Sequence, residues 1–491
     1  MNTIANTSLN SLVQPPCYDR SALKPHIVHI GCGAFHRAHQ ALYTHLLAAQ
    51  TPSAWGICEV SLFSGEPLFS DLANQDGLYT VLEQYNQQKS AECVGTIVAS
   101  VSKKRDGSQA IIEQLASVDT RIVSLTITEK GYCIDAASGQ LDRANPAIAH
   151  DLQSPQDPES AIGYIVAGLA RRRQLGREAY TVLSCDNIQG NGHVLRNAIL
   201  QYANVIDTEL AQWIEQYASF PCTMVDRIVP AATQESLHFV EQEIGVYDPC
   251  AIACESFKQW VIEDNFVQGR PDWDLVGAQF VDDVTAYEAM KLRMLNGSHS
   301  FLAYLGVLAG YEYIADCMNN PDIYRCVQTL MLTVQAPTLN VTKELDLNAY
   351  AKQLLERFCN RCIYHRTEQI AMDGSQKIAY RLVNSLRYHL DNKNDIRLLA
   401  TGIAAWIRYT TATDDRGDTI EVVDPLKDRL NQLYQQFGTG VEVVPYILAL
   451  EAIFPQDIGH NPEVIAAVSQ AYQCLLEYGA KHTIAQLAEA L

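Results

Sequence analysis

The sequence is poor in basic residues and in long apolar runs. It has 36 Lys and Arg against 56 Asp and Glu, a net charge of −20 at pH 7, and a field of this sign repels phosphate backbones and anionic lipid. The apolar runs are too short to cross about 30 Å of hydrocarbon. We therefore expect neither nucleic acid nor a membrane as a partner. A small anionic substrate stays possible, because a pocket responds mainly to its nearest charges.

Closely spaced cysteines are scarce as well. Apart from Cys250/Cys254 and Cys359/Cys362, the 14 cysteines are scattered singly along the chain, without the repeated paired spacings of metal sites or disulfide frameworks. The opening segment, MNTIANTSLNSLVQPP, lacks the basic and apolar regions of a signal peptide. These absences predict a cytoplasmic protein with reduced thiols. A repeat of roughly 20 to 50 residues is also missing, which excludes solenoids and propellers.

The composition is that of an ordinary globular protein, 48% hydrophobic and 19% charged. The length of 491 residues is enough for more than one domain. Short apolar runs predict strands at 26–30, 55–62, 79–82, 96–99, 121–127 and 179–184. Helical stretches between several of them favour a mainly parallel sheet covered on both faces. The segment 151–160 carries two prolines and several acids and is expected to be an exposed loop.

From about residue 283 the pattern becomes helical. Helices are predicted over 287–311, 326–334, 347–358, 376–390, 398–409, 425–436 and 462–478. We therefore predict an α/β protein with two domains. Residues 1–284 form a Rossmann-type, doubly wound domain, and residues 285–491 form a mostly α-helical C-terminal domain.

The first predicted strand runs directly into Gly31-Cys-Gly33 and then into a helix expected over 35–49. The first glycine permits a tight turn, and the second lets backbone approach a pyrophosphate. His36 stands where the usual fingerprint has its third glycine, so an ordinary strand–helix junction remains an alternative. Arg37 lies in the first helical turn, where a cation opposes the helix dipole unless an anion binds.

We expect this turn to bind NAD, with contacts from Gly31, Gly33, Ala34, Phe35 and Arg37. An acid near the end of the second strand usually holds the adenosine ribose. Glu66 is the expected residue and Glu59, inside the strand, is the other candidate, although either could be a plain surface acid. His36 and His39 have the spacing of a metal pair, but the sequence shows no third ligand cluster, so we expect no metal.

A second group of polar residues stands within an apolar helical segment, Glu288-Ala-Met-Lys291-Leu-Arg-Met-Leu-Asn296-Gly-Ser-His299. On a helix of about 3.6 residues per turn, Lys291, Asn296 and His299 fall within one broad face. Such a face costs desolvation energy unless its groups bind one another or a polar ligand. A solvated face with an extended lysine is the simpler alternative.

Five motifs in order along the chain carry a resemblance. They are Gly31-Cys-Gly-Ala-Phe-His-Arg-Ala-His-Gln40, Ser184-Cys-Asp-Asn187, Met224-Val-Asp-Arg-Ile-Val-Pro230, Lys291-Leu-Arg-Met-Leu-Asn-Gly-Ser-His299 and Asp373-Gly-Ser-Gln-Lys377. Together they resemble the mannitol dehydrogenase family of long-chain polyol dehydrogenases and hexuronate reductases. The segments 57–63, 126–132 and 259–266 look most like its fructuronate reductase (D-mannonate oxidoreductase) branch.

The resemblance implies an NAD-dependent oxidoreductase in which Lys291 is the acid/base and no metal is required. Transfer of a hydride to a ketone creates an alkoxide, which Lys291 would protonate. The pKa of a free lysine, near 10.4, would have to fall to about 7–8 for this task. Asn187 and Asn296 would donate to the oxygen that becomes negative.

Three more residues receive roles from the resemblance, each with a plain structural alternative. His299 would orient substrate hydroxyls, but it could be a core histidine. Asp226 would contact the substrate or fix Lys291, but it could cap a helix. Glu288 would lead the proton toward solvent, but an ordinary ion pair at i, i+3 would use it equally well.

The substrate is less closely defined. A uronate has a carboxylate where mannitol has a CH2OH group, so its pocket should supply a cation or a fork of donors. We expect Lys377 and Arg381 to bind substrate, and Arg366 and His365 are further candidates. The mannitol branch tends to carry an Arg and a His just before Asp-Gly-Ser, where this chain has Gln369 and Met372.

The resemblance thus implies interconversion of D-fructuronate and D-mannonate, a step in hexuronate breakdown. The alternative within the family is mannitol 2-dehydrogenase or a related polyol dehydrogenase, acting on fructose and mannitol. A third hypothesis is a regulatory protein that binds NAD without catalysis. The sequence leaves the oligomeric state open, and a monomer is possible.

Overall fold

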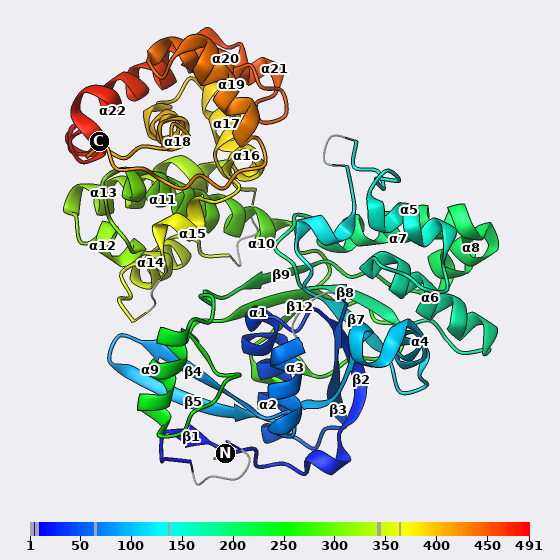
Figure 1. Ribbon diagram of the computed structural model, residues 1–491. Helices are drawn as coiled ribbons and strands as arrows, with labels where there is room; N and C mark the ends of the chain where they lie inside the picture. The colour runs from blue at the N-terminus through cyan, green and yellow to red at the C-terminus, as the bar shows by residue number, and fades with distance from the viewer. Residues whose placement is uncertain (1–3, 5–8, 63–65, 136–137, 341–344, 363–364) are drawn as a thin grey trace. The chain divides into compact units, whose positions relative to one another are not determined.

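The chain folds into two compact units, Met1–Thr285 and Ala286–Leu491. The computed structural model describes residues 4, 9–62, 66–135, 138–340, 345–362 and 365–491. The first unit combines strands with helices, and the second is built from helices (Figure 1). The predicted fold class, an α/β domain of Rossmann type followed by a helical domain, is confirmed.

A five-stranded parallel sheet organises the first unit. In spatial order its strands are β6 (Ile97–Ser102), β3 (Trp55–Ser61), β2 (Lys24–Ile30), β7 (Ile122–Leu125) and β8 (Thr181–Ser184). Neighbouring residues face opposite sides, so that Val28 and Ile30 enter one hydrophobic cluster and Ile27 enters another. Both faces are therefore buried, which explains the almost unbroken apolar runs of these strands.

Helices cover both faces of this sheet. The cluster that contains Val28 is completed by α4 (Lys103–Ala116), α6 (Ala161–Gln174), α7 (Asn191–Ile206) and α8 (Thr208–Tyr217). The cluster that contains Ile27 is completed by α1 (Ala34–Ala38), α2 (Gln40–Gln50) and α3 (Glu66–Asn74). The remaining helices of this unit are α5 (Pro146–Gln153) and α9 (Gln234–Ile244), with short 3-10 turns at Arg20–Ala22, Glu129–Tyr132 and Trp273–Val276.

Two smaller sheets extend the first unit. One has the order β1 (Val13–Gln14), β5 (Gln88–Val94), β4 (Tyr79–Tyr85) and β10 (Ile252–Glu255), and the other β12 (Gln279–Val281), β11 (Gln259–Glu263) and β9 (Thr223–Asp226). The strand expected at 79–82 thus lies outside the parallel sheet. It pairs antiparallel with β5 through a tight turn in which Asn86 has a positive φ of 54°.

Two other expectations for this unit were wrong in detail. The helix expected over 35–49 is two helices, because His39 takes φ −124° and ψ −93° between α1 and α2. The segment 151–160 is not simply an exposed loop. Asp151 ends up fully buried and accepts hydrogen bonds from the backbone N–H groups of Glu159 (2.6 Å) and Ser160 (3.0 Å). This acid is thus an internal anchor, not a solvated charge.

The second unit packs its helices around α11 (Ser298–Leu308), every residue of which is buried. The others are α10 (Thr285–Met290), α12 (Ile314–Met318), α13 (Pro321–Thr329), α14 (Leu347–Phe358), α15 (Thr367–Ala371), α16 (Gly374–Ile378), α17 (Asn384–Asp391), α18 (Arg397–Tyr409), α19 (Lys427–Phe437), α20 (Val444–Leu448), α21 (Gln456–Gly459) and α22 (Pro462–Glu489), with 3-10 turns at Ala336–Thr338 and Val441–Val443. The helix expected to end at 478 continues, with Gly479 (φ 74°) forming a kink.

Three π-helical segments interrupt the helices of this unit. They are η4 (Lys291–Gly297), η5 (Leu330–Gln335) and η7 (Ala379–Val383). Such segments close hydrogen bonds from i to i+5 and are frequent at functional sites. The helices predicted over 287–311, 326–334 and 376–390 each contain one of them.

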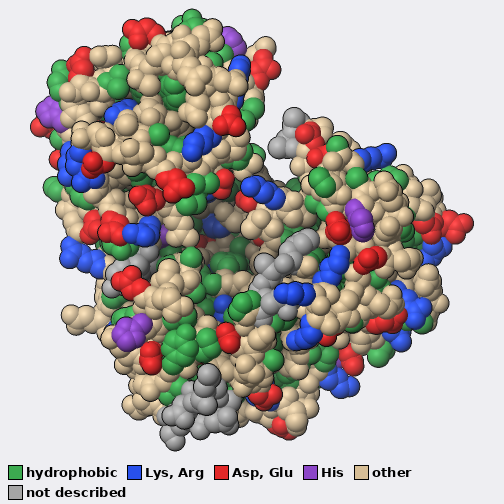
Figure 2. Space-filling model, in the orientation of Figure 1, with side chains coloured by type: hydrophobic (Ala, Val, Ile, Leu, Met, Phe, Trp, Pro, Cys, Tyr) green, Lys and Arg blue, Asp and Glu red, His purple; other side chains and the backbone are tan. Residues whose placement is uncertain are grey.

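Charged side chains of both signs are mixed on the surface. On the face drawn in Figure 2, acidic and basic side chains are interspersed, without a broad basic patch among the residues shown. Within the part of the chain that the structure describes, no helix combines the length and the apolarity that a bilayer span requires.

Candidate active site

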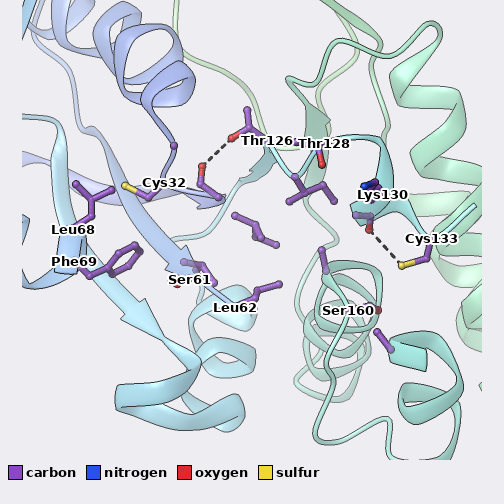
Figure 3. A pocket seen from close by; sticks show the side chains of 18 of the residues that line it. Cys32, Ser61, Leu62, Leu68, Phe69, Thr126, Thr128, Lys130, Cys133 and Ser160 are labelled. Atoms are coloured by element: carbon purple, nitrogen blue, oxygen red, sulfur yellow. Dashed lines mark hydrogen bonds between the residues drawn. The ribbon is translucent and has the colours of Figure 1, made fainter. Parts of the chain in front are cut away.

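A cavity of about 560 Å³ opens in the first unit at the carboxyl ends of the central strands (Figure 3). Its walls come from the loops that follow β2, β3 and β7, from α3 and from the starts of α5 and α6. The lining residues include Gly31, Cys32, Gly33, Ser61, Leu62, Leu68, Phe69, Thr126, Thr128 and Lys130. This edge of a doubly wound sheet is where such folds bind dinucleotides.

The turn after β2 requires its first glycine. Gly31 has φ +107°, and a Cβ atom there would lie 2.3 Å from the carbonyl oxygen of Thr126. Gly33 has an ordinary φ of −78°, and an added Cβ would meet nothing closer than 4.0 Å. Neighbouring protein atoms therefore do not demand the second glycine, which fits a position kept open for close approach by a ligand.

The wall contributed by the loop after β7 is strained and held in place by Asp186. Thr128 has φ 62° and ψ 169°, a region of backbone conformation that residues other than glycine rarely adopt. The Asp186 carboxylate accepts hydrogen bonds from the N–H groups of Ile127 (3.0 Å) and Thr128 (2.9 Å) and from the Tyr132 hydroxyl (2.8 Å). Burial raises the pKa of Asp186 to about 6. Sequence analysis missed this clamp, although Asp186 stands in the motif that ends at Asn187.

Among the described residues, the cavity lining contains Gly31 and Gly33 but not Ala34, Phe35 or Arg37. The Phe35 ring stacks on His39, with ring centroids 4.9 Å apart. The Arg37 guanidinium is buried, donates to the carbonyl of Cys250 and lies over the Tyr79 ring. The printed contacts of Arg37 thus pack α1 on the neighbouring sheet, and its role in cofactor binding stays a prediction.

Glu66 and Glu59 are the two acids that the sequence analysis considered for binding the adenosine ribose. Glu66 begins α3, but its side chain lies outside the part of the chain that the structure describes. Glu59 is fully buried within β3 and binds His36, so it is not a candidate. Lys130, which the sequence analysis did not single out, is a cation in the cavity lining. The similarity of segment 126–132 to the family was the signal for it.

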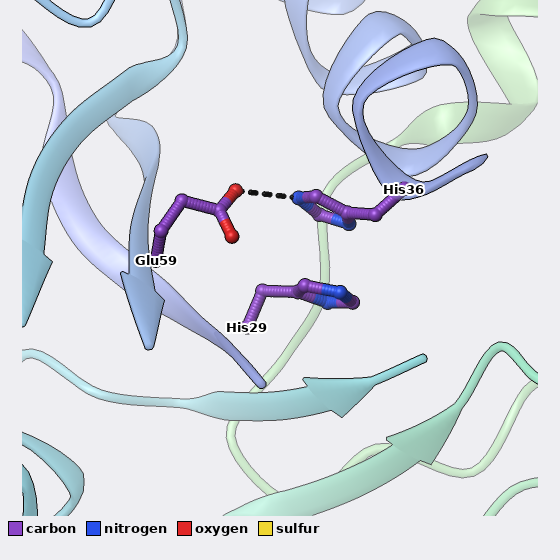
Figure 4. Close-up of side chains that lie close together, drawn as sticks. All are labelled: His29, His36 and Glu59. Atoms are coloured by element: carbon purple, nitrogen blue, oxygen red, sulfur yellow. Dashed lines mark hydrogen bonds and ion pairs between the residues drawn. The ribbon is translucent and has the colours of Figure 1, made fainter. Parts of the chain in front are cut away.

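His29, His36 and Glu59 form a buried cluster beneath the glycine turn (Figure 4). Its rings do not suit a metal ion. The two imidazoles are stacked with centroids 3.4 Å apart and planes 13° apart, so their in-plane lone pairs run parallel and do not converge on one ion about 2 Å from each nitrogen. His36 is instead bonded to the Glu59 carboxyl group at 2.7 Å. Burial raises the pKa of Glu59 to about 7 and lowers that of His36 to about 3.

Two predicted site residues lie at the ends of strands that belong to different sheets of the first unit. Asn187 is exposed and comes shortly after β8, and Asp226 ends β9 with 3% of its surface exposed. The buried Asn191 side chain joins the end of β8 to the start of β9 by donating to the carbonyls of Asp186 (3.0 Å) and Thr223 (2.9 Å). The sequence analysis did not assign Asn191 a role.

In the second unit, η4 sets the relation between Lys291 and Asn296. A π-turn bonds i to i+5 and rotates less per residue than an α-helix, so residues five apart lie closer together around its axis than the roughly 140° that an α-helix gives. Lys291 and Asn296 are therefore nearer to one side of η4 than on the expected α-helix. The sequence predicted one broad face for them and missed the π-turn that narrows it.

Two buried polar atoms in this region have no hydrogen-bond partner among the described residues. They are Asn296 Nδ2 and His299 Nε2, and the two residues are each 6% exposed. Burial, with the charges of Arg357, Arg381 and Lys291 nearby, holds the pKa of His299 well below its usual range, so its ring is neutral at pH 7. An unmet buried donor costs about 1–3 kcal/mol. These atoms are suited to binding the hydroxyl or carbonyl oxygens of a ligand.

The remaining predicted residues lie in the second unit and make other contacts. Lys377 Nζ donates to the Met372 carbonyl at 2.6 Å. Arg381 Nη1 donates to the Ser300 hydroxyl at 3.0 Å and to the Asn296 carbonyl at 3.4 Å. Arg381 therefore supports the segment that carries Asn296. Glu288 is buried in α10, one turn before Lys291.

Two family models match the chain. The mannitol dehydrogenase Rossmann domain matches residues 25–275, and the mannitol dehydrogenase C-terminal domain matches residues 283–476. Over 489 residues the chain is 53% identical to a D-mannonate oxidoreductase of Escherichia coli (strain K12), covering 99% of this chain and 100% of that protein. An uncharacterized oxidoreductase of the same strain, YeiQ, is 51% identical and covered over 99% of both chains.

A solved structure matches over the same extent. It is the Pseudomonas fluorescens mannitol 2-dehydrogenase in ternary complex with NAD and D-mannitol, 38% identical, with a TM-score of 0.91 and coverage of 98% of both chains.

Proposed function

Because this chain belongs to the mannitol dehydrogenase family, we propose that it is an NAD-dependent oxidoreductase that interconverts D-fructuronate and D-mannonate. The observation that carries this proposal is the 53% identity to a D-mannonate oxidoreductase along the whole of both chains. The reaction is a hydride transfer between the cofactor and a secondary alcohol carbon, without a metal.

The first unit is the cofactor domain of this proposal. Its cavity supplies the glycine turn at Gly31 and Gly33, hydroxyl groups at Ser61 and Thr128, and the cation Lys130. This donor set suits a diphosphate and its riboses. When bound, NAD supplies or accepts the hydride. The chain's residues bind the cofactor and prevent the clamped loop after β7 from collapsing into the cavity.

The second unit supplies the proton in this proposal. Lys291 Nζ gives a proton to the oxygen of the carbonyl during reduction and removes it during oxidation. Asn296 donates to the same oxygen while it carries negative charge. His299, neutral and buried, orients the neighbouring hydroxyl, and Glu288 leads the proton away. Asn187 and Asp226 of the first unit keep their predicted roles, as an oxyanion donor and as a substrate contact.

A specific observation also favours mannitol 2-dehydrogenase as a second candidate. The solved mannitol 2-dehydrogenase has a TM-score of 0.91 to this chain. That structure holds D-mannitol, a neutral polyol that lacks the carboxylate. The two candidates share one mechanism and differ in what holds the far end of the substrate.

The deciding experiment is a steady-state assay with NADH and either D-fructuronate or D-fructose. We expect the higher kcat/KM with fructuronate. If kcat/KM for fructose equals or exceeds kcat/KM for fructuronate, the protein would instead be a mannitol 2-dehydrogenase. If the protein bound NADH but turned over none of mannonate, altronate, mannitol and arabinitol, the non-catalytic hypothesis would be supported instead.

A further inference from the structure

The glycine turn of the cofactor cavity is held from beneath through the carbonyl group of Gly31. This oxygen lies 3.0 Å from His29 Nε2. It also accepts hydrogen bonds from the Thr126 hydroxyl (2.8 Å) and from the N–H of Gly33 (2.7 Å). Because a carbonyl oxygen only accepts, Nε2 of His29 must carry the hydrogen of this contact. The other ring nitrogen of His29 is bonded to the Ser124 hydroxyl on β7 (2.8 Å). The conformation of the turn therefore depends on His29.

From His29 the same cluster leads to the carboxyl group of Glu59. The His29 ring stacks on that of His36, with centroids 3.4 Å apart, and His36 Nε2 is bonded to Glu59 Oε1 at 2.7 Å (Figure 4). Cys32, which lines the cavity, contacts this carboxyl group through its thiol. Glu59 is thus connected to the glycine turn along two routes, through the two imidazoles and through Cys32.

The surroundings of Glu59 are poorly suited to a negative charge. The residue is fully buried, and its Oε2 atom has no hydrogen-bond partner within the described part of the chain. An ionised carboxylate in such a place loses its hydration without full replacement, which favours the neutral acid.

One neighbouring group opposes this preference. Among the described residues, the titratable or charged side chains that face or adjoin Glu59 are His29 from β2, His36 and Arg37 from α1, Cys32 from the turn, Cys58 from β3 and Tyr79 from β4. The strand β6 contributes Ser100 opposite Glu59, which does not titrate. Burial lowers the pKa of the two histidines and raises that of the thiols and the phenol, so of these groups Arg37 alone is charged at pH 7. Its guanidinium donates to the carbonyl of Cys250. Burial outweighs its attraction and raises the pKa of Glu59.

We propose that His29, His36 and Glu59 position the glycine turn for the cofactor, and that binding of the cofactor's diphosphate favours the protonated carboxyl group of Glu59. This inference rests on the proposed cofactor role of the first unit and is independent of the substrate. A diphosphate brings negative charge to the turn that contains Gly31 and Cys32, and ionised Glu59 beneath that turn repels it across a medium without water. The neutral acid does not. The affinity for NADH is therefore highest below the pKa of Glu59 and falls as the pH rises through it.

The test is fluorescence titration of NADH between pH 6 and pH 9 into the wild type and Glu59→Gln, which keeps the shape of the neutral acid at every pH. We expect the ratio of the wild-type Kd to the variant Kd to grow about tenfold over this range, the factor given by a difference of one in pKa between free and bound protein. Asp186, with a pKa of about 6, titrates in both proteins and cancels in the ratio. Glu129→Gln removes an exposed acid beside Lys130 and should keep the wild-type pH dependence.

A second pair of variants tests the contact between His29 and Gly31. His29→Leu removes the N–H that faces the Gly31 carbonyl, and we expect its Kd for NADH at pH 6 to rise about tenfold, the free energy of one hydrogen bond. His29→Gln keeps an N–H donor and should stay within about threefold of the wild type. Equal losses in the two variants would assign His29 to packing and remove it from the positioning of the turn.

Calorimetric titration of NADH in buffers with different enthalpies of ionisation counts the protons that binding takes up. At pH 7.5 we expect about half a proton for the wild type and much less for Glu59→Gln. A Kd ratio that is the same at pH 6 and pH 9, or equal proton uptake in the two proteins, would overturn the link, whatever the stability of the variant. If Glu59→Gln does not fold, the wild type decides alone: uptake that peaks between pH 7 and pH 8 supports the link, and zero uptake overturns it. A wild type that binds no NADH at any pH would refute the cofactor role itself, so the two failures are distinguishable.

Discussion

The cofactor cavity of the first unit and the Lys291 region of the second are built in opposite ways. The cavity is shaped by backbone: a glycine at φ +107°, a threonine at φ 62° and a buried carboxylate that binds two N–H groups. The Lys291 region is shaped by side chains on a π-helical turn, where polar atoms of Asn296 and His299 have no partner in the part of the chain that the structure describes.

The comparison shows which kind of unfavourable free energy each region contains. In the cavity the strain lies in backbone angles and is balanced within the protein, so the walls keep their shape without a ligand. Around Lys291 the cost lies in unmet donors, about 1–3 kcal/mol for each, and it is recovered when a ligand binds. We therefore expect changes in the first region to act on cofactor binding and stability, and changes in the second to act on turnover.

The largest effect should come from Lys291→Ala. Loss of a positioned acid/base should lower kcat by about 10²–10⁴ while the Kd for NADH, measured by fluorescence titration, stays within about twofold. Lys352→Ala, an exposed lysine on α14, is the control and should be as active as the wild type. Retained turnover in Lys291→Ala would remove this residue from the mechanism and with it the contrast between the two regions.

Next in size is Gly297→Ala in η4. An added Cβ would lie 2.6 Å from the backbone oxygen of Arg381 and 2.2 Å from Gln335 Nε2, so η4 must move and misalign Lys291 and Asn296. Displacements of about 1 Å can cost about 100-fold in rate, and we expect a loss of this order in kcat with NADH binding preserved. The control is Gly402→Ala in α18, whose Cβ would meet only side-chain atoms. Equal kcat values for the two variants would show that the π-turn is not needed for alignment.

Gly31→Ala should act on the other region. The Cβ would clash with the Thr126 carbonyl, and φ +107° disfavours any side chain. The turn would have to open to relieve the clash and the strain. We therefore expect the Kd for NADH to rise about tenfold, while kcat at saturating NADH changes little. Gly277→Ala, at φ +98° with nothing within 4 Å, carries similar strain outside the cavity. If both variants bind NADH equally well, the turn does not shape the cofactor site.

The smallest effect concerns the buried pair in Figure 4. Burial raises the pKa of Glu59 from 4.5 to about 7, so between these values the folded protein keeps a proton that the unfolded chain has lost. The stability from this group is therefore greatest below pH 4.5 and is lost as the pH rises through 7. Glu59→Gln has no such proton to lose, and its free energy of unfolding relative to wild type should rise by about 1–3 kcal/mol between pH 5 and pH 8.

Urea unfolding at the two pH values measures this difference, with Glu209→Gln as an exposed control. A gap between Glu59→Gln and the wild type that is the same at both pH values would contradict the burial argument, whatever its size.

Much of the fold followed from local pattern, and the reason differs between elements. Strands β2, β3 and β7 are short apolar runs that a two-sided sheet requires, and α14 lies where it was expected. The break at His39 and the π-turn at Lys291 were missed, because helical spacing of apolar residues is nearly the same with or without one extra residue in a turn. Asp151 and Asp186 look like surface acids until the N–H groups that bind them are seen.

The family was readable from the chain itself. The glycine turn and the motifs around Asn187, Lys291 and Asp373 are local in sequence, and the resemblance they carried was confirmed. Which cation lies beside His299, which acid clamps the loop after β7 and how Lys291 lines up with Asn296 were decided by tertiary packing. A charged side chain that becomes buried must bind another protein group or a ligand. Whether it becomes buried depends on segments that meet only after the chain has folded.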